Sequence, residues 1–204
     1  MPPASRRAHG RLSAVTVSAH TAFPADGFTA AWATAGGEHE ERVTLRWENE
    51  AWTAASSLSR ERVEVVVRLS PLWHVRQVLL FRDLDEPDLW IGTDGHGHWG
   101  EINGAHRTEL DGATDVSVAD GGRTISAFVH AVPVRRLPVE VGGSFDTRVV
   151  EIDVETLGLE AVLRTYRRVD DAIWEVATPD GALTVTVDEY GLPVDVEGAF
   201  RRIA

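Results

Sequence analysis

The most constraining feature of the chain is a two-residue alternation of apolar and polar side chains that begins near Arg42. Val43, Leu45 and Trp47 alternate with polar residues, and the segment 63–70 repeats the pattern. Successive side chains of a strand point to opposite faces of a sheet, so this period predicts strands with one buried face. Asp-Gly and Gly-Gly pairs, which are typical of tight turns, separate the segments. The alternation therefore favours an all-β fold, mainly antiparallel.

The same criteria predict a series of short strands along the chain. The predicted strands cover 43–48, 63–70, 73–81, 89–93, 98–102, 114–118, 125–132, 134–141, 145–154, 172–177 and 183–187. Segment 155–168 has the composition of a helix but also alternates, so a strand, or a short helix that turns into a strand, is expected there. Many short strands at this spacing indicate a barrel or a sandwich. We expect a single, partly open β-barrel that has room for a short helix.

The first 40 residues differ from the rest of the chain. They are rich in alanine and glycine, and their mildly apolar stretch is interrupted by Thr16, Ser18 and His20. This stretch lacks the leucine-rich density of a signal peptide. We therefore expect residues 1–40 to be an extension that is loosely ordered or covers a sheet edge, residues 41–204 to be the β-barrel domain, and the protein to be cytoplasmic.

Composition argues against several classes of function. The net charge of −12 disfavours binding to nucleic acid and to anionic membrane surfaces. No segment approaches the ~20 apolar residues of a membrane span, so stable membrane insertion is not expected. The chain has no cysteine, and all 20 basic residues are arginines. A thiol nucleophile, a thiolate metal site and a lysine Schiff base are therefore excluded.

The chain carries no recognised catalytic or cofactor motif. The G-x-S-x-G, H-E-x-x-H, G-x-G-x-x-G and phosphate-loop patterns are all absent. The segment DGHGHW places His96 and His98 on one face of an extended chain, but two imidazoles are only half of a tetrahedral site. No third ligand follows at a diagnostic spacing. We interpret DGHGHW as a hairpin tip and expect no metal, no cofactor and no catalytic residue.

Two adjacent arginines lie in VPVRRLPV, residues 132–139, a run that otherwise resembles a buried strand. In a strand, Arg135 and Arg136 would lie on opposite faces, one in solvent and one inside. Burying an unpaired guanidinium is prohibitive, so the inner arginine needs a carboxylate, a set of carbonyls or a ligand anion. If an acid of the chain such as Asp115 pairs with the inner arginine, the arginine has a structural role. If the inner arginine faces an empty cavity instead, it is a candidate contact for the head group of a ligand.

The count of seven tryptophans is high for a chain of this length. Several fall in predicted strands: Trp47, Trp73, Trp90, Trp99 and Trp174. They either fill a core or line the cavity of a barrel that is too wide for its own side chains to fill.

Seven segments, taken in order, resemble a known bacterial family. They are LRWEN, VRQVLLFRDLDEPDLW, DGHGHW, LDGATDVSV, VPVRRLPV, LRTYRRV and VDEYGLPVDVEGAFRRI. Over Arg42 to Ile203 the sequence is similar to the bacterial putative glycolipid-binding protein family, whose fold is similar to that of periplasmic lipoprotein-carrier factors. The resemblance implies an antiparallel, partly open barrel with a hydrophobic cavity.

The leading hypothesis is non-enzymatic binding of a lipid or glycolipid in an apolar barrel cavity. The expected wall residues are Trp90, Trp99 and Tyr166, and the expected polar residues are Arg135, Arg136 and Asp115. Two alternatives stay open. One is a small hydrolase or isomerase that acts in the same cavity with His98 or His130 as its base, and the other is a filled barrel that serves as an interaction module.

Overall fold

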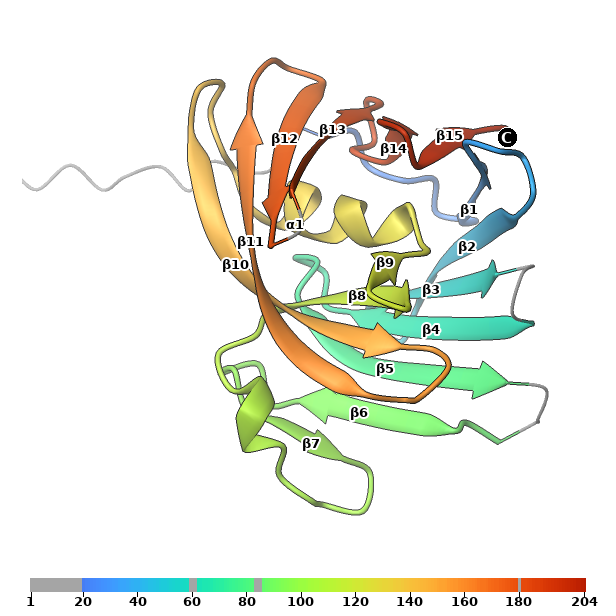
Figure 1. Ribbon diagram of the computed structural model, residues 1–204, viewed down its shortest axis with the longest axis vertical. Coiled ribbons are helices and arrows are strands. Elements are labelled where there is room, and N and C mark those ends of the chain that lie inside the picture. Colours follow the sequence, from blue (N-terminus) through green and yellow to red (C-terminus); the bar gives the residue numbers. More distant parts are fainter. Residues whose placement is uncertain (1–19, 59–61, 83–85, 180) are drawn as a thin grey trace, which may run out of the picture.

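A single curved sheet of 15 strands forms the frame of the molecule in the computed structural model (Figure 1). The structure describes residues 20–58, 62–82, 86–179 and 181–204, so the first half of the predicted extension lies outside the described residues. The strands are β1 Phe28–Thr34, β2 Glu40–Glu48, β3 Ala51–Leu58, β4 Val63–Leu69, β5 Val75–Arg82, β6 Leu89–Thr93, β7 Trp99–Glu101, β8 Asp115–Asp120, β9 Arg123–Thr124, β10 Ser144–Asp153, β11 Leu159–Arg168, β12 Ile173–Thr178, β13 Gly181–Val187, β14 Pro193–Val196 and β15 Phe200–Arg202. The helices are η1 Thr108–Leu110, η2 Phe128–His130 and α1 Ala131–Arg136.

The sheet runs in the order β7-β6-β5-β4-β3-β2-β1-β15-β14-β13-β12-β11-β10-β8-β9. Neighbouring strands are antiparallel except for β8 and β10, which are parallel. Most connections are therefore short hairpins, as the turn dipeptides predicted. Within the described part of the chain, no pairing joins the edge strands β7 and β9. The prediction of an all-β, mainly antiparallel, partly open barrel is confirmed.

Strands with strong alternation were predicted well, whereas β1, β3 and the short strands β9, β14 and β15 were not predicted. The ambiguous segment 155–168 contains strand β11. Strand β1, FTAAWAT, lies inside the range 1–40 and pairs with β2 and β15, so the sheet begins at Phe28. Strand β3, AWTAASSL, was also missed. Alanine and serine give little contrast between the two faces of a strand, and both segments therefore lack a clear period of two.

The strands predicted over 125–132 and 134–141 are wrong, because this part of the chain forms η2 and α1. Every residue from Ser126 to Arg135 is buried. A helix that is enclosed on all sides needs no polar face, so the helical period of 3.6 does not show in its sequence. Pro133 lies in the first turn of α1, where a missing N–H group is tolerated.

Helices η2 and α1 cross the hollow of the sheet and connect β9 to β10 (Figure 1). A crossover of this kind is what a parallel strand pair requires. Large buried side chains of the strands, among them Trp32, Trp99, Trp174 and Tyr166, form one core cluster with Phe128 of η2 and Val132 of α1. The centre of the barrel is therefore filled by the chain itself. Among the described residues, no helix has the length and apolar character needed to cross a membrane.

Candidate functional site

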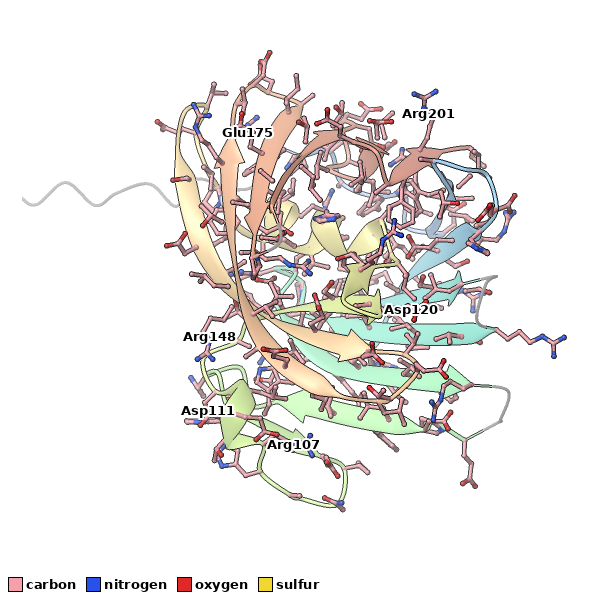
Figure 2. All side chains as sticks on the ribbon, viewed as in Figure 1. Arg107, Asp111, Asp120, Arg148, Glu175 and Arg201 are labelled. Atoms are coloured by element: carbon pink, nitrogen blue, oxygen red, sulfur yellow. The ribbon has the colours of Figure 1, made fainter. Side chains whose placement is uncertain are left out.

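A pocket of about 440 Å³ lies at one end of the sheet, where three hairpins meet. The β1–β2, β8–β9 and β14–β15 turns form its walls, and Asp120 marks the end of β8 in Figure 2. Its lining residues are Thr34, Ala35, Gly36, Glu38, His39, Glu40, Glu41, Leu58, Asp120, Gly121, Arg123, Thr124, Ile125, Gly198, Ala199 and Phe200. The volume lies in the range of about 300 to 1,000 Å³ that is typical of small-molecule sites.

The pocket combines apolar side chains with an acidic rim. Leu58 and Phe200 are buried, and Ile125 is partly buried against the core. Three acidic residues of the lining, Glu38, Glu40 and Asp120, form the rim together with a single arginine, Arg123, while a fourth, Glu41, is buried. A rim of this sign repels phosphate and carboxylate groups, whereas carboxylate oxygens accept hydrogen bonds from hydroxyl groups. The pocket therefore suits a ligand that has an apolar part and a neutral, hydroxyl-rich part.

Glu41 connects this pocket to the helix that fills the barrel. Its Oε1 accepts hydrogen bonds from the hydroxyls of Ser56 (2.7 Å) and Ser126 (2.5 Å). Its Oε2 accepts from the backbone N–H groups of Ala127 (2.6 Å) and Phe128 (3.2 Å) at the start of η2. Complete burial raises the pKa of the Glu41 carboxyl, and these four hydrogen bonds offset part of the shift. Sequence reasoning missed Glu41 because it sits among acidic neighbours that are exposed.

Arg136 has an in-chain carboxylate as its partner. Its Nη2 lies 2.6 Å from Oδ2 of Asp115, and its Nε donates to Oδ1 at 3.3 Å. The two side chains are only 8% and 1% exposed. The hydroxyls of Thr114 and Thr147 also donate to the Asp115 carboxylate. The buried Asp115 carboxylate thus accepts hydrogen bonds from three side chains of the protein.

Arg135 also points inward, toward carbonyl groups and aromatic rings. Its guanidinium donates to the backbone carbonyl of Tyr190 and, at 3.4 Å, to that of Thr21. The Cζ atom lies 4.4 Å from the ring centroid of Phe23 and 4.5 Å from that of Trp73. Burial lowers the pKa of Arg135 to about 10. The expectation that one arginine lies in solvent assumed a strand, and the short helix α1 brings both side chains into the interior.

The three predicted wall residues lie in separate places, and none of them lines the 440 Å³ pocket. Trp99 is buried, and its Nε1 donates to the carbonyl of Ala113 at 2.9 Å. Tyr166 is buried with its ring stacked on Phe145. Trp90 lines a second, more open hollow along β4–β7.

The two histidines considered as catalytic bases also lie away from the pocket lining. His130 is buried, and its Nδ1 lies 3.1 Å from the hydroxyl of Tyr166. Burial lowers the pKa of His130 to about 3, so the imidazole is neutral at ordinary pH. His98 is exposed at the β6–β7 hairpin.

The pocket itself could not be predicted from the sequence. It lies in hairpin turns, and turns have no regular alternation of apolar and polar residues that would indicate a site.

Fold and pocket together describe a partly open β-barrel whose hollow is filled by a helix and which has a pocket of about 440 Å³ at its hairpin end. The chain belongs to the family described as putative glycolipid-binding, whose model matches residues 29–202. This membership confirms the resemblance and supports a binding role.

A solved structure has the same fold. It is the crystal structure of a DUF1089 family protein from Pseudomonas aeruginosa, with a TM-score of 0.64 and 21% sequence identity. The match covers 97% of this chain and 100% of that chain. A comparison with curated proteins found no match.

Proposed function

We propose that the protein binds a glycolipid in the 440 Å³ pocket at the hairpin end of the barrel. The observation that carries the proposal is the combination of an acidic, hydroxyl-accepting rim with apolar side chains below it. The sugar would lie against Glu38, Glu40 and Asp120, and the alkyl part against Leu58, Ile125 and Phe200. Family membership supports the same class of ligand.

The two parts of such a ligand would contribute differently to binding. Burial of alkyl groups contributes about 0.8 kcal/mol per methylene, so the length of the buried chain would dominate the affinity. A hydrogen bond to a charged group contributes roughly 1.5 to 3 kcal/mol, and it requires a correctly placed hydroxyl. The acidic rim would therefore select the head group more than it sets the overall affinity.

In this proposal, the residues that the sequence predicted as ligand contacts are structural. The Asp115–Arg136 ion pair joins the start of β8 to the end of α1, and β8 reaches the pocket at Asp120. Trp99 and Tyr166 are buried in the core, outside the pocket lining. The proposed ligand contacts are instead in the turns.

Filling the pocket should weaken the binding of an alkyl glycoside. Ala35 is exposed and lines the pocket, so Ala35→Trp should occupy the cavity with little effect on folding. We expect wild-type protein to bind dodecyl maltoside one to one, and Ala35→Trp to bind it at least about tenfold more weakly, a change of 1.4 kcal/mol. Calorimetry below the critical micelle concentration, with native mass spectrometry for stoichiometry, measures both.

The matched control is Ala182→Trp, because Ala182 is also exposed but lies on β13, outside the pocket lining. It should bind dodecyl maltoside as the wild type does. Dodecanoate and dodecyl phosphate, which carry the same chain on an anionic head, should bind more weakly than the maltoside. Equal binding by Ala35→Trp and the wild type would refute the pocket as the binding site. Tighter binding of the anionic ligands would refute the proposed role of the acidic rim in selecting the head group. A complete lack of binding would favour the filled barrel as an interaction module.

A further inference from the structure

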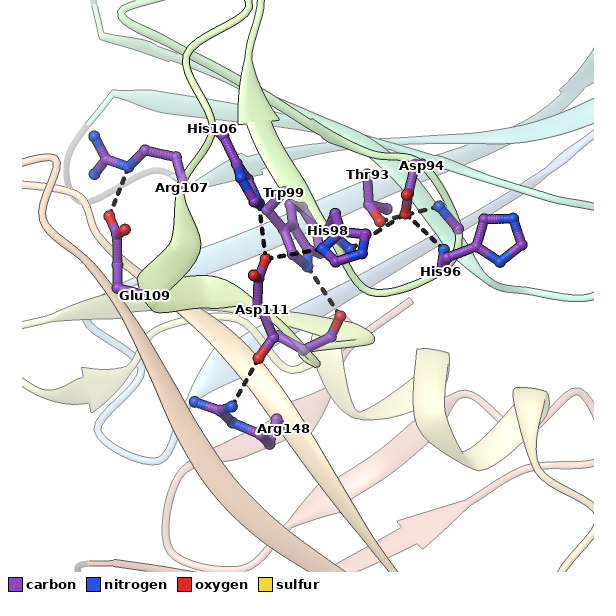
Figure 3. Close-up of polar contacts among 12 residues, drawn as sticks. Thr93, Asp94, His96, His98, Trp99, His106, Arg107, Glu109, Asp111 and Arg148 are labelled. Atoms are coloured by element: carbon purple, nitrogen blue, oxygen red, sulfur yellow. Dashed lines mark hydrogen bonds and ion pairs between the residues drawn. The ribbon is translucent and has the colours of Figure 1, made fainter.

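Three potential metal ligands meet beside the β6–β7 hairpin (Figure 3). His98 Nδ1 lies 3.4 Å from Asp111 Oδ1, and His106 Nε2 lies 3.0 Å from the same oxygen. All three ligand atoms lie within 4.8 Å of one another. The sequence paired His98 with His96, but the fold pairs it with two residues that follow later in the chain.

The hairpin that carries His98 is fixed by its own turn. Oδ1 of Asp94 accepts hydrogen bonds from the backbone N–H groups of His96 (2.7 Å) and His98 (3.2 Å). Gly95 and Gly97 have φ angles of 82° and 93°, which favour glycine. The peptide positions on both sides of His98 are thus determined before any ion binds.

The loop that carries Asp111 is held against this turn. The backbone N–H of Gly112 donates to the carbonyl of Gly97 at 2.8 Å, and a Cβ atom on Gly97 would lie only 3.3 Å from the Gly112 Cα. On the other side, Arg148 of β10 donates to the Asp111 carbonyl at 2.7 Å, as Figure 3 shows. The β6–β7 turn and strand β10, which are far apart in the sequence, therefore fix the backbone at Asp111 and Gly112.

His106 is placed by the strand next to it. It forms a bridge with Gly100, and the following residue, Arg107, donates its backbone N–H to the carbonyl of Trp99 at 2.8 Å. The buried Trp99 side chain anchors this strand to the carbonyl of Ala113. Each of the three ligands is therefore attached to a rigid part of the backbone, and only side-chain rotations are needed to adjust them.

The distances fit a small ion. Bonds of about 2.0 to 2.2 Å in a tetrahedral site place neighbouring ligand atoms ~3.4 Å apart. The two separations that involve Asp111 Oδ1, 3.4 and 3.0 Å, are already close to that value. Two imidazoles with one carboxylate suit zinc and similar transition metals, whereas magnesium and calcium prefer oxygen ligands alone.

We propose that His98, His106 and Asp111 bind one Zn²⁺ ion, with the remaining coordination positions open to solvent. All three side chains are exposed enough for an ion to enter, at 60%, 49% and 36%. The net charge of −12 also favours a cation over an anion. The site is separate from the 440 Å³ pocket, with which it shares no residue, so neither proposal depends on the other.

Zinc titration of the untagged, full-length protein tests this proposal. Calorimetry should give one Zn²⁺ per chain for the wild type. His98→Ala, His106→Ala and Asp111→Asn should each weaken binding by at least about tenfold, because the loss of even a hydrogen-bond partner of a ligand typically costs about 10- to 100-fold in metal affinity. His96→Ala is the matched control, because His96 lies in the same turn but outside the cluster, and it should stay within about twofold of the wild type.

Two further measurements separate a metal site from a mere hydrogen-bonded cluster. Co²⁺ should give visible absorption bands with the wild type and with His96→Ala but not with His98→Ala. Zn²⁺ should raise the Tm of the wild type in a concentration-dependent way, because an ion that binds only the folded chain stabilises it. Absence of stoichiometric Zn²⁺ binding, or equal loss of binding in His96→Ala and His98→Ala, would overturn the proposal.

Discussion

Replacement of Asp115 by alanine is expected to lower the free energy of unfolding by about 3 to 5 kcal/mol, because it leaves the buried guanidinium of Arg136 without its partner. The two side chains are 1% and 8% exposed, so water cannot compensate for the lost carboxylate. The hydroxyl of Thr147 would also lose its acceptor. Denaturant unfolding, monitored by tryptophan fluorescence, measures the change.

An exposed ion pair provides the matched control. Arg167 and Glu175 lie 2.7 Å apart with side chains that are 52% and 50% exposed, so Glu175→Ala should cost less than about 1 kcal/mol. The double variant Asp115→Leu with Arg136→Met removes both charges and should recover much of the stability lost in Asp115→Ala. A stable Asp115→Ala variant that no longer binds dodecyl maltoside would contradict the structural role and assign Asp115 to the ligand.

The segment VPVRRLPV shows where sequence patterns fail for the fold. Its valines and prolines favour an extended chain, yet the segment begins within α1, with Val132 and Val134 buried in the hollow of the sheet. Tertiary burial overrides local preference here, because a surrounded helix gains apolar contacts on every side. By contrast, β4 alternates clearly and was predicted closely, since one of its faces contacts the core and the other contacts solvent.

The sites depend on contacts that no local pattern contains. His98, His106 and Asp111 are spaced irregularly in the sequence, and only the packing of the η1 loop on the hairpin tip brings them together. The need for a partner for the paired arginines could be predicted, since burial of a lone charge is prohibitive, and Asp115 is the acid that contacts Arg136. The location of the pocket could not be predicted, because three turns from distant parts of the chain form it.

Glu41→Ala is expected to destabilise the protein by about 2 to 6 kcal/mol, because two buried backbone N–H groups lose their acceptor at roughly 1 to 3 kcal/mol each. These groups belong to Ala127 and Phe128, at the start of the helix that fills the barrel. Glu41→Gln should be much less harmful. Its carbonyl oxygen can accept from both N–H groups, while its amide donates to the hydroxyls of Ser56 and Ser126.

The difference in the free energy of unfolding between Glu41→Gln and the wild type should also depend on pH. Burial raises the pKa of Glu41 in the folded protein, so between the unfolded and folded pKa values the folded state binds more protons than the unfolded chain. The wild type should therefore lose stability as the pH rises through that interval, while the glutamine variant lacks this titration. Urea unfolding of both proteins from about pH 4 to pH 8 should show the variant gaining stability relative to the wild type. A difference that stays constant across this range, or one that favours the wild type as the pH rises, would show that the four hydrogen bonds outweigh burial and keep Glu41 ionised.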